Sequence, residues 1–462
     1  IARVSASTPV GWSLLLRLVS FGGGAGLRIV PLMFSALAVI AAYGYVRSLP
    51  WPRLFQARLS AALAGISALM TPSALGRDDL KQYTADAFVA LMILWLVSRL
   101  ESNWTRRRLI AVGGVVVVGF LFSAVAVFVG AAAFGSLLLV ALIRRNWSQA
   151  IESAAVGAAS GVILGLTFLA LYKPGIPPGL TTYWGASYLP IAQGWGPTWK
   201  FLIAHVRPLA TSYLGMGSML VAVPLIVVGV ATLGSLRRFA TGLVVPVLAA
   251  EMVILGAIKQ YPFLDFRTSH FLTTALAVTV AVGIGGIGTV LSRLHVAASA
   301  AVALLAVALL LINPQVRNAV RAKPIPAEDL RTPTRYIEGH QQPDDVIVVA
   351  MLSSWGFAYY SSSGTPAIEP VTSNLQQFVT IFPDRPNVLV ATDRTVAAVD
   401  AVMNRAAAAA ATIGPTARVW IIHQHAQVAE LKAFSAAARA HGFAVTSVIK
   451  NSLDLLTRTT MG

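Results

Sequence analysis

The sequence predicts an α-helical polytopic membrane protein that carries a small α/β domain at its C-terminus. Apolar residues make up 56% of the 462 residues and charged residues only 11%. Together with a mean hydropathy of +0.72, this composition is too apolar for a water-soluble chain of this length. Long apolar runs recur up to residue 313, and beyond Pro324 they give way to short alternating helix and strand patterns.

The excess of basic charge belongs to the membrane part. Residues 1–321 carry 24 basic and 7 acidic side chains, whereas residues 322–462 carry 11 of each, so the net charge of +17 lies before residue 322. This distribution is typical of membrane topology and of contact with membrane lipids, and it argues against nucleic-acid binding. Cysteine is absent from the sequence, which excludes disulfides, thiolate metal sites and a cysteine nucleophile.

Apolar runs long enough to cross a bilayer core of about 30 Å recur through the first part. The run from 109 to 143 has room for two helices, because about 20 residues suffice for one, and we expect a hairpin that turns near Phe122 and Ser123. About ten spans are therefore expected. The runs cover residues 28–46, 57–72, 83–99, 109–143, 150–172, 208–233, 239–258, 269–291 and 296–313.

Before the first of these spans, the stretch from Pro9 to Ser20 is short and amphipathic and contains Trp12. It ends just before the helix-breaking glycines at 22–24. Such a segment suits a helix that lies in the membrane interface. The expected domains are an outer-face interfacial segment (1–27), a transmembrane bundle (28–321) and a soluble extracytoplasmic α/β domain (322–462).

The charge of the loops predicts the orientation of the bundle. With ten spans, the loops on one side are short and their basic residues are all arginines, while the loops on the other side are longer. The positive-inside rule applies to short loops, so we expect the arginine loops in the cytoplasm and the C-terminal domain outside. The arginines concerned are Arg47, Arg53, Arg58, Arg99, Arg106, Arg107, Arg108, Arg144, Arg145, Arg237, Arg238 and Arg293.

The segment after Pro324 alternates between helix and strand patterns. Alternating helices and strands indicate a small α/β domain. No Gly-rich phosphate loop follows any of the expected strands, so a nucleotide site is not indicated. We expect helices over 328–340, 395–412 and 426–441, and strands over 346–350, 387–391, 418–423, 443–449 and 453–458.

The stretch from Gly76 to Asp86 gathers charged side chains in an outer loop that runs into a span. Lys81, Tyr83 and Asp86 follow one another closely enough to lie on nearby faces of one helical turn. A lysine there can hold a phosphate as a point charge, and a carboxylate can orient a hydroxyl or accept its proton. The alternative is an interfacial cluster of salt bridges without a chemical role.

The part of this stretch from Leu80 to Asp86 resembles the loop motif of GT-C class bacterial membrane glycosyltransferases. The subgroup is the one related to protein O-mannosyltransferases and to the aminoarabinose transferase of lipid A. The resemblance lies in the joint order of short motifs over nearly the whole chain, and the last two are similar to the soluble tail of actinobacterial members. These further motifs are Ser7–Pro9 with the helix that follows, Gly26–Pro31, Tyr261–Arg267, Glu328–Arg331 and Val419–Ile422.

The resemblance implies a GT-C-like bundle and an inverting transfer of a sugar from a polyprenyl-phosphate donor on the outer face. Arg267 is the main candidate for binding the donor phosphate, because its planar fork suits two phosphate oxygens, and Lys81 is the second. A contact between Arg267 and a lipid headgroup, without catalysis, is the alternative. The general base of the family is an Asp in the first outer loop, which we expect upstream of Ile1.

The remaining site residues are expected to form the pocket. Asp78 and Asp79 can bind acceptor hydroxyls or a divalent cation, the one candidate cofactor. Tyr83, Asp86, Tyr261 and His270 complete the expected pocket.

The expected location is the bacterial plasma membrane, and the acceptor is a lipid, a glycan or a protein. Two other functions are alternatives. A flippase or transporter of lipid-linked sugars would share the basic face and the many spans, but such proteins often contain paired internal repeats, which this sequence does not show convincingly. A non-catalytic assembly protein of the cell envelope would use the outer domain for binding.

Overall fold

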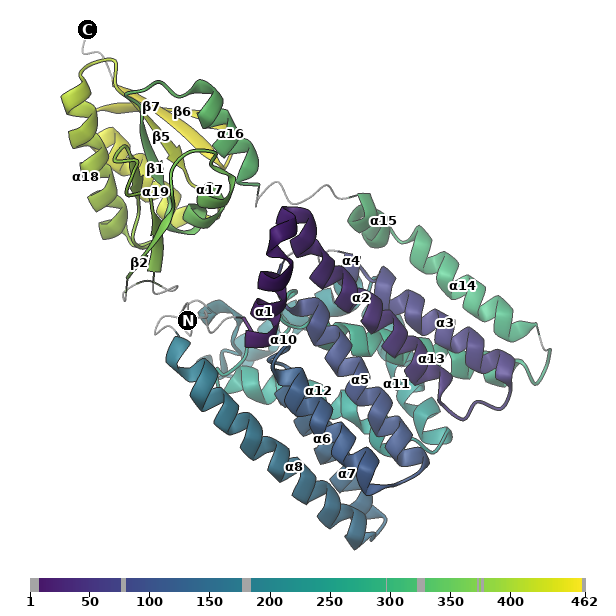
Figure 1. Cartoon of the computed structure of the whole chain (residues 1–462). Coiled ribbons are helices and arrows are strands. Elements are labelled where there is room, and N and C mark those ends of the chain that lie inside the picture. Colours follow the sequence, from purple (N-terminus) through teal and green to yellow (C-terminus); the bar gives the residue numbers. More distant parts are fainter. Residues whose placement is uncertain are drawn as a thin grey trace. The chain divides into compact units, whose positions relative to one another are not determined.

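The computed structural model describes residues 8–75, 80–176, 184–295, 297–321, 329–371, 374 and 378–458. The chain forms two compact units, and the described residues up to Arg321 belong to the first while those from Asp329 onward belong to the second. The described part of the first unit consists of helices and loops, and the second combines helices with two sheets (Figure 1).

Each of the expected spans overlaps a long helix of the first unit. The hairpin expected near Phe122 is confirmed, because one helix ends at Phe120 and the next begins at Ala126. The long helices are α2 (Gly23–Arg47), α3 (Leu54–Met70), α5 (Tyr83–Ser102), α6 (Arg106–Phe120), α7 (Ala126–Ile143), α8 (Trp147–Thr167), α11 (Met219–Ser235), α12 (Phe239–Ala257), α13 (His270–Leu291) and α14 (Ala298–Ile312).

Shorter helices precede or connect these. The span expected from residue 208 begins only at Met219, because Pro208 ends a short helix, a π-helical turn follows, and Gly215 and Gly217 have positive φ angles that break the helix. The short helices are α1 (Val10–Val19), α4 (Pro72–Leu75), α10 (Trp195–Pro208) and α15 (Pro314–Arg321).

The first unit is built to cross a membrane several times. Within the described residues, seven helical stretches are long and apolar enough to span a bilayer, and one of these, α18 (Val396–Ile413), belongs to the second unit. The pair α14 and α15, which bends by 55°, would add one more as a broken span. The chain is therefore a multi-pass membrane protein. The stretches in the first unit are Val10–Arg47, Tyr83–Ser102, Ala126–Ile143, Trp147–Tyr172, Phe239–Ala257 and His270–Leu291.

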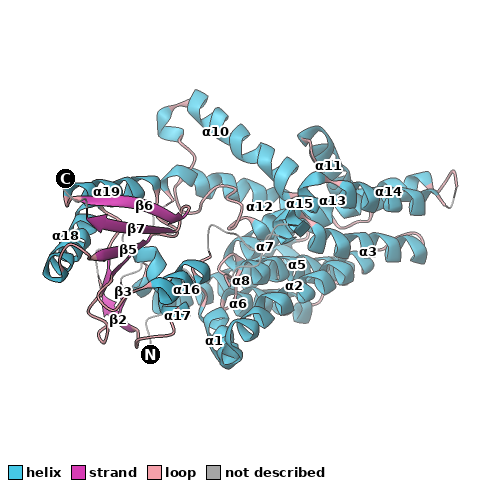
Figure 2. Ribbon diagram, turned by 90° about the horizontal axis from the view of Figure 1, so that it is seen from above, coloured by secondary structure: helices cyan, strands magenta, loops and turns pink. Residues whose placement is uncertain are grey.

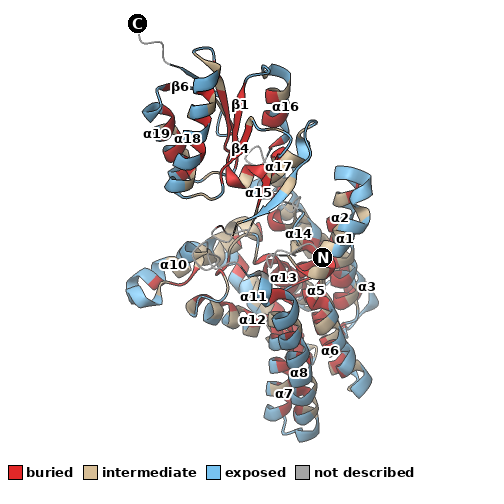
Figure 3. Ribbon diagram, turned by 60° about the vertical axis from the view of Figure 1, so that its left-hand side comes forward, coloured by how far each residue is buried: buried red, intermediate tan, exposed pale blue. Residues whose placement is uncertain are grey.

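Helix α8 shows how the bundle meets its surroundings. Its apolar side chains point outward, among them Ile151 (66% exposed) and Val162 (62%). Figure 3 shows most of this helix coloured as exposed, beside the more buried α7. A continuous exposed apolar face of this length is unfavourable in water and suits contact with lipid chains.

Glycines allow α13 to pack closely against α11. A Cβ atom on Gly283 would lie 2.5 Å from the carbonyl oxygen of Leu225, and one on Gly229 would lie 2.2 Å from that of Thr279. Small residues at such contacts let two helix backbones approach, which is the main way helices associate in lipid. This contact fixes α13, whose first turn carries His270.

We expect Gly283→Leu to destabilise the bundle by at least about 1–3 kcal/mol, because the new side chain must push α11 away from α13. The thermal midpoint and the gel-filtration profile of the detergent-purified chain measure this. Gly161→Leu on α8 is the matched control, because a Cβ atom there meets nothing within 4 Å. Equal behaviour of the two variants would contradict the packing argument.

Glu101, in the last turn of α5, closes the N-terminus of α12. Its Oε1 accepts the backbone N–H of Ala240 at 2.8 Å, and its Oε2 accepts the N–H and the hydroxyl of Thr241 at 2.8 and 2.5 Å. A carboxylate at this position satisfies free N–H groups and complements the helix dipole. It therefore ties α5 to α12 at the end of the bundle opposite to the start of α5.

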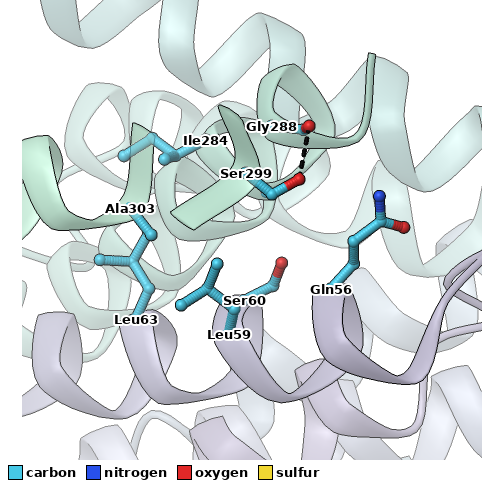
Figure 4. Close-up of a pocket in the computed structure, with 9 residues that line it drawn as sticks. Gln56, Leu59, Ser60, Leu63, Ile284, Gly288, Ser299 and Ala303 are labelled. Atoms are coloured by element: carbon cyan, nitrogen blue, oxygen red, sulfur yellow. Dashed lines mark hydrogen bonds between the residues drawn. The ribbon is translucent and has the colours of Figure 1, made fainter. Parts of the chain in front are cut away.

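A small void lies between α3, α13 and α14 (Figure 4). Its volume of about 10 Å³ has room for about one water molecule. Ser299 donates to the carbonyl oxygen of Gly288 at 2.7 Å, as the dashed line in Figure 4 marks. Gln56 Nε2 donates to the Ser292 hydroxyl at 2.8 Å. These bonds join the helices, and the void is too small for a substrate.

The second unit contains a five-stranded sheet in the order β4-β1-β5-β7-β6. Figure 2 shows β5, β7 and β6 side by side in this sheet. The first three strands are parallel, with Ile347 beside Val388 and Val346 beside Val419. The fourth strand, β7, runs antiparallel to both of its neighbours, β5 and β6. The strands are β1 (Val346–Val349), β4 (Val388–Val390), β5 (Arg418–Ile422), β6 (Phe443–Ile449) and β7 (Leu453–Arg458), and an antiparallel pair comprises β2 (Ala367–Pro370) and β3 (Phe378–Ile381).

Helices cover both faces of this sheet. Alternate residues of β1 point to opposite sides, so Val348 packs in one apolar cluster with α18 and α19 (Val428–Ala440), while Val349 packs with α16 (Arg331–His340) and α17 (Ser354–Tyr360). Figures 1 and 2 show α18 and α19 together on one side of the sheet and α16 and α17 on the other. The expected α/β domain is confirmed.

Candidate functional site

The candidate site begins at the start of α5. Lys81 is exposed in the turn before the helix, Tyr83 is the half-buried first residue of α5, and Asp86 in the first turn is buried at 2% exposure. One oxygen of Asp86, Oδ1, has no hydrogen bond of normal length among the described residues, and the Ser123 hydroxyl lies near this carboxyl group. Burial of a polar atom without a partner is unfavourable, and such groups often mark functional sites.

The loop between α12 and α13 forms the second part of the site. Asp265 Oδ1 accepts the backbone N–H groups of Arg267 at 3.0 Å and of Thr268 at 3.1 Å, which makes a tight turn. The Tyr261 hydroxyl donates to the carbonyl oxygen of Thr268 at 2.9 Å. These bonds hold the backbone on both sides of Arg267, whose side chain is exposed.

Tyr261 connects the two parts. Burial raises the pKa of the Tyr261 phenol well above its ordinary value, and the nearby Asp86 carboxylate and Tyr83 hydroxyl raise it further. The phenol therefore stays protonated at neutral pH and remains a hydrogen-bond donor. Its ring packs edge-on against Phe128 of α7, with 5.0 Å between centroids. The structure thus brings together Tyr83, Asp86 and Tyr261 from two segments far apart in the sequence.

His270, expected in the same pocket, is the first residue of α13 and is buried at 3% exposure. Its Nδ1 lies 2.8 Å from the hydroxyl oxygen of Ser73 in α4. This contact ties α4, which leads into the loop before Lys81, to the start of α13. The sequence offers no signal for Ser73, because a serine beside an apolar run is unremarkable.

The amphipathic helix expected near the N-terminus is α1, and it packs against the segment that leads into α5. The indole of Trp12 is fully buried, and its Nε1 donates to the carbonyl oxygen of Leu80 at 2.9 Å. The backbone N–H of Gly11 donates to the carbonyl oxygen of Leu121 at 2.7 Å, which joins α1 to the turn between α6 and α7. A Cβ atom at Gly11 would also lie 2.7 Å from that oxygen, so this position requires glycine.

Trp12 is therefore a positioning residue that the sequence analysis missed. The amphipathic pattern of residues 9–20 predicts only a helix in the membrane interface. What the sequence could not give is the partner of the indole N–H, since this contact joins residues 12 and 80.

Asp78 and Asp79 lie outside the described residues. In the part of the chain that the structure describes, no group of three or more His, Asp or Glu side chains could hold a metal ion. The proposed role of this Asp pair, in binding acceptor hydroxyls or a divalent cation, stays a prediction.

Comparisons of the sequence with protein-family models and with curated proteins find no match. The fold does have solved neighbours. This chain has the GT-C glycosyltransferase fold of its solved neighbours.

Two of these neighbours are ArnT and AglB. The structure of ArnT from Cupriavidus metallidurans bound to undecaprenyl phosphate aligns with 100% of this chain and 89% of its own, with a TM-score of 0.58 and 12% identity. The archaeal oligosaccharyltransferase AglB from Archaeoglobus fulgidus, in complex with an inhibitory peptide and a dolichol-phosphate, aligns with 98% of this chain and 66% of its own (TM-score 0.50, 13% identity).

This chain is shorter than the archaeal neighbours. Another structure of the Archaeoglobus fulgidus oligosaccharyltransferase, in complex with Zn and sulfate, is matched by 77% of this chain at a TM-score of 0.45 and 15% identity. That alignment spans about half, 52%, of the neighbour's length.

Proposed function

We propose that this chain transfers a sugar from a polyprenyl-phosphate donor to an acceptor of the cell envelope at the outer face of the membrane. The observation that carries the proposal is the likeness of the whole chain to ArnT, whose structure holds undecaprenyl phosphate. AglB, which shares the fold, is in complex with a dolichol-phosphate. Both ligands are lipid phosphates of the kind the sequence motifs predict.

In this proposal the donor brings its own leaving group, a lipid phosphate on which negative charge develops during transfer. Arg267 would donate to two of its oxygens, and Lys81 would add a second positive charge. The turn made by Asp265 and the bond from Tyr261 to Thr268 support this role, because they hold the backbone around Arg267. A group that must meet developing charge works best when it is already in position.

The cluster of Tyr83, Asp86 and Tyr261 would then face the sugar or the acceptor. Tyr261 supplies a hydroxyl that stays protonated, and Asp86 supplies a buried carboxylate oxygen that can accept a hydrogen bond from a sugar hydroxyl. His270, beside Ser73, would shape the same pocket, with Asp78 and Asp79 toward the acceptor. An inverting reaction also needs a general base, and by resemblance to the family this would be an Asp.

The proposed orientation places the start of α5 and the second unit outside the bacterial plasma membrane. The arginine-only short loops at the other end of the helices would then lie in the cytoplasm. The acceptor would be a lipid, a glycan or a protein.

Transfer can be tested with the full-length protein in liposomes that contain a labelled polyprenyl-phosphate sugar and a cell-envelope extract from a strain lacking the gene. The proposal predicts that label leaves the lipid carrier, appears in an envelope component and leaves free polyprenyl phosphate in equal amount. Liposomes without protein are the control.

The same liposomes distinguish the other two functions. A flippase would move intact labelled lipid between leaflets, which protects it from a membrane-impermeant reagent without cleavage of the phosphate–sugar bond. An assembly protein would neither cleave nor move it. Either result would refute the transferase proposal.

A further inference from the structure

A second hollow lies at the other end of the bundle, between α7, α11 and α12. Its volume is about 390 Å³, within the range of about 300–1,000 Å³ typical of small-molecule sites. It lies beside the first residues of α12, whereas the loop that carries Tyr261 and Arg267 follows the last residues of that helix. The groove is therefore separate from the candidate transfer site.

The walls of the groove are apolar and open toward the outer surface of the bundle. Ile143 and Phe239, which line it, are 70% and 44% exposed, so they face the surrounding lipid rather than the protein core. Gly234 and Gly242 leave the space open, and a Cβ atom on Gly234 would meet only the ring of Phe239, at 3.8 Å. A hydrocarbon chain suits such a surface better than a polar solute.

One arginine lines this groove, and three more lie in the adjoining turns after α7 and α11. The guanidinium of Arg144 lies over the ring of Phe239, 4.8 Å from its centroid, and it lines the groove. Arg145 and Arg237 are exposed in the turns that follow α7 and α11. Arg238 is buried, and its Nε has no hydrogen-bond partner among the described residues.

Acidic groups do not cancel this charge at the mouth. Residues 140–151 and 230–250 contain no Asp or Glu. The residues that follow these ranges are Glu152, which already accepts bonds from Trp104 and Arg106, and Glu251, which lies further along α12. The nearest carboxylate known from the contacts is Glu101, which interacts electrostatically with Arg238 and is hydrogen-bonded to Ala240 and Thr241 at the start of α12. The exposed guanidinium groups of Arg144, Arg145 and Arg237 therefore present a net positive surface beside an apolar groove.

We propose that this groove binds an anionic phospholipid, with one acyl chain between α7, α11 and α12 and the phosphate held by Arg144 and the neighbouring arginines. The apolar groove and the arginines together favour this kind of lipid. An apolar groove open to the membrane needs a lipid chain, and a cluster of arginines at headgroup depth favours a negatively charged headgroup over a zwitterionic one.

The test uses the full chain in mild detergent, stripped of lipid and then given phosphatidylglycerol or phosphatidylcholine in equal amounts. Native mass spectrometry counts the lipid molecules that stay bound. We expect preferential retention of phosphatidylglycerol, and a loss of about fivefold in its apparent affinity for Arg144→Gln, since one arginine near a lipid headgroup contributes that much. Arg53→Gln, an exposed arginine in the loop between α2 and α3, is the charge control.

A second pair of variants tests the groove itself. Gly234→Leu fills it and should reduce retention of phosphatidylglycerol, whereas Gly114→Leu, on an exposed part of α6 where a Cβ atom meets nothing within 4 Å, should not. Equal retention of the two lipids, or equal effects of Arg144→Gln and Arg53→Gln, would mean that only ordinary boundary lipid is bound and would overturn the proposal. The arginine variants alter exposed side chains, so they remain informative if Gly234→Leu fails to fold.

Discussion

Arg267→Ala should lower the rate of sugar transfer by about 100- to 1,000-fold while leaving the fold intact. This is the loss typical when one preorganised donor to a developing negative charge is removed. The substitution removes an exposed side chain and keeps the turn at this position, because the turn is made by the backbone N–H groups that bond to Asp265. Transfer from labelled polyprenyl-phosphate sugar, measured at saturating donor, gives the rate.

The matched control is Arg293→Ala, which removes another exposed arginine just beyond the other end of α13. Arg267→Lys keeps the charge but not the planar fork, so it should restore only part of the activity. Lys81→Ala should cause a smaller loss, since it removes the second charge. If Arg267→Ala and Lys81→Ala both transfer at the normal rate, the phosphate site is misassigned.

Apolar run length predicted the bundle well because a membrane span has few alternatives. In lipid, a single apolar run such as 239–258 can hydrogen-bond all of its backbone N–H and C=O groups within itself only as a helix. The helix α12 accordingly occupies residues 239–257. The error at 208–219 arose where local chemistry overrode hydropathy. Pro208 and two glycines with positive φ break a stretch that is apolar enough to span.

In the α/β unit, the sequence pattern predicted only the buried strands. Buried strands such as β1, with four consecutive apolar residues, stand out from the sequence. The strands β2 and β3 were missed, because β2 is Ala-Ile-Glu-Pro with mostly exposed side chains and has neither an apolar run nor clean alternation. Its pairing with β3 depends on tertiary contact rather than on local pattern.

The candidate site was predicted only in outline. The spacing predicted Lys81, Tyr83 and Asp86 on one helical turn. In the structure Tyr83 and Asp86 lie in the first turn of α5, whereas Lys81 precedes the helix. The proximity of Tyr261 to Asp86 could be expected only from the resemblance to a family, because it depends on how α5 packs beside the loop before α13. Contacts of single polar atoms, such as Ser73 with His270, leave no periodic trace in the sequence.

The second large effect is expected at Asp345, which is buried before β1 in the second unit. Its carboxylate accepts bonds from Arg418 Nε at 2.9 Å, from the Trp420 indole N–H at 2.8 Å and from the backbone N–H of Gln342 at 2.8 Å. Asp345→Ala leaves Arg418 and the buried indole without this acceptor. Removal of one partner of a buried ion pair costs about 3–5 kcal/mol, and we expect the lower end of this range because the Arg418 side chain is 24% exposed.

Hydrogen exchange of the full chain, followed by mass spectrometry, can localise this loss. Amides of β1 and β5 should exchange roughly 100- to 1,000-fold faster in Asp345→Ala, if they open with the whole unit, while those of α12 and α13 should not change. Asp344→Ala is the control, since Asp344 is the exposed neighbour in the sequence. Similar exchange in both variants would show that the Asp345 bonds do not hold the sheet together.

The same carboxylate predicts how the second unit responds to acid. Burial alone would raise the pKa of Asp345, but the bonds from Arg418, Trp420 and Gln342 outweigh it and hold the pKa below its ordinary value. A carboxyl group whose pKa is lowered by folding stabilises the folded state at pH values above its unfolded pKa of about 3.9. This stabilisation is lost as the pH falls from that value through the lower pKa of the folded state. Pepsin cleavage of the second unit should therefore rise steeply below about pH 4. In Asp345→Asn, which has no charge to lose, that steep rise should be reduced and cleavage at higher pH should be greater.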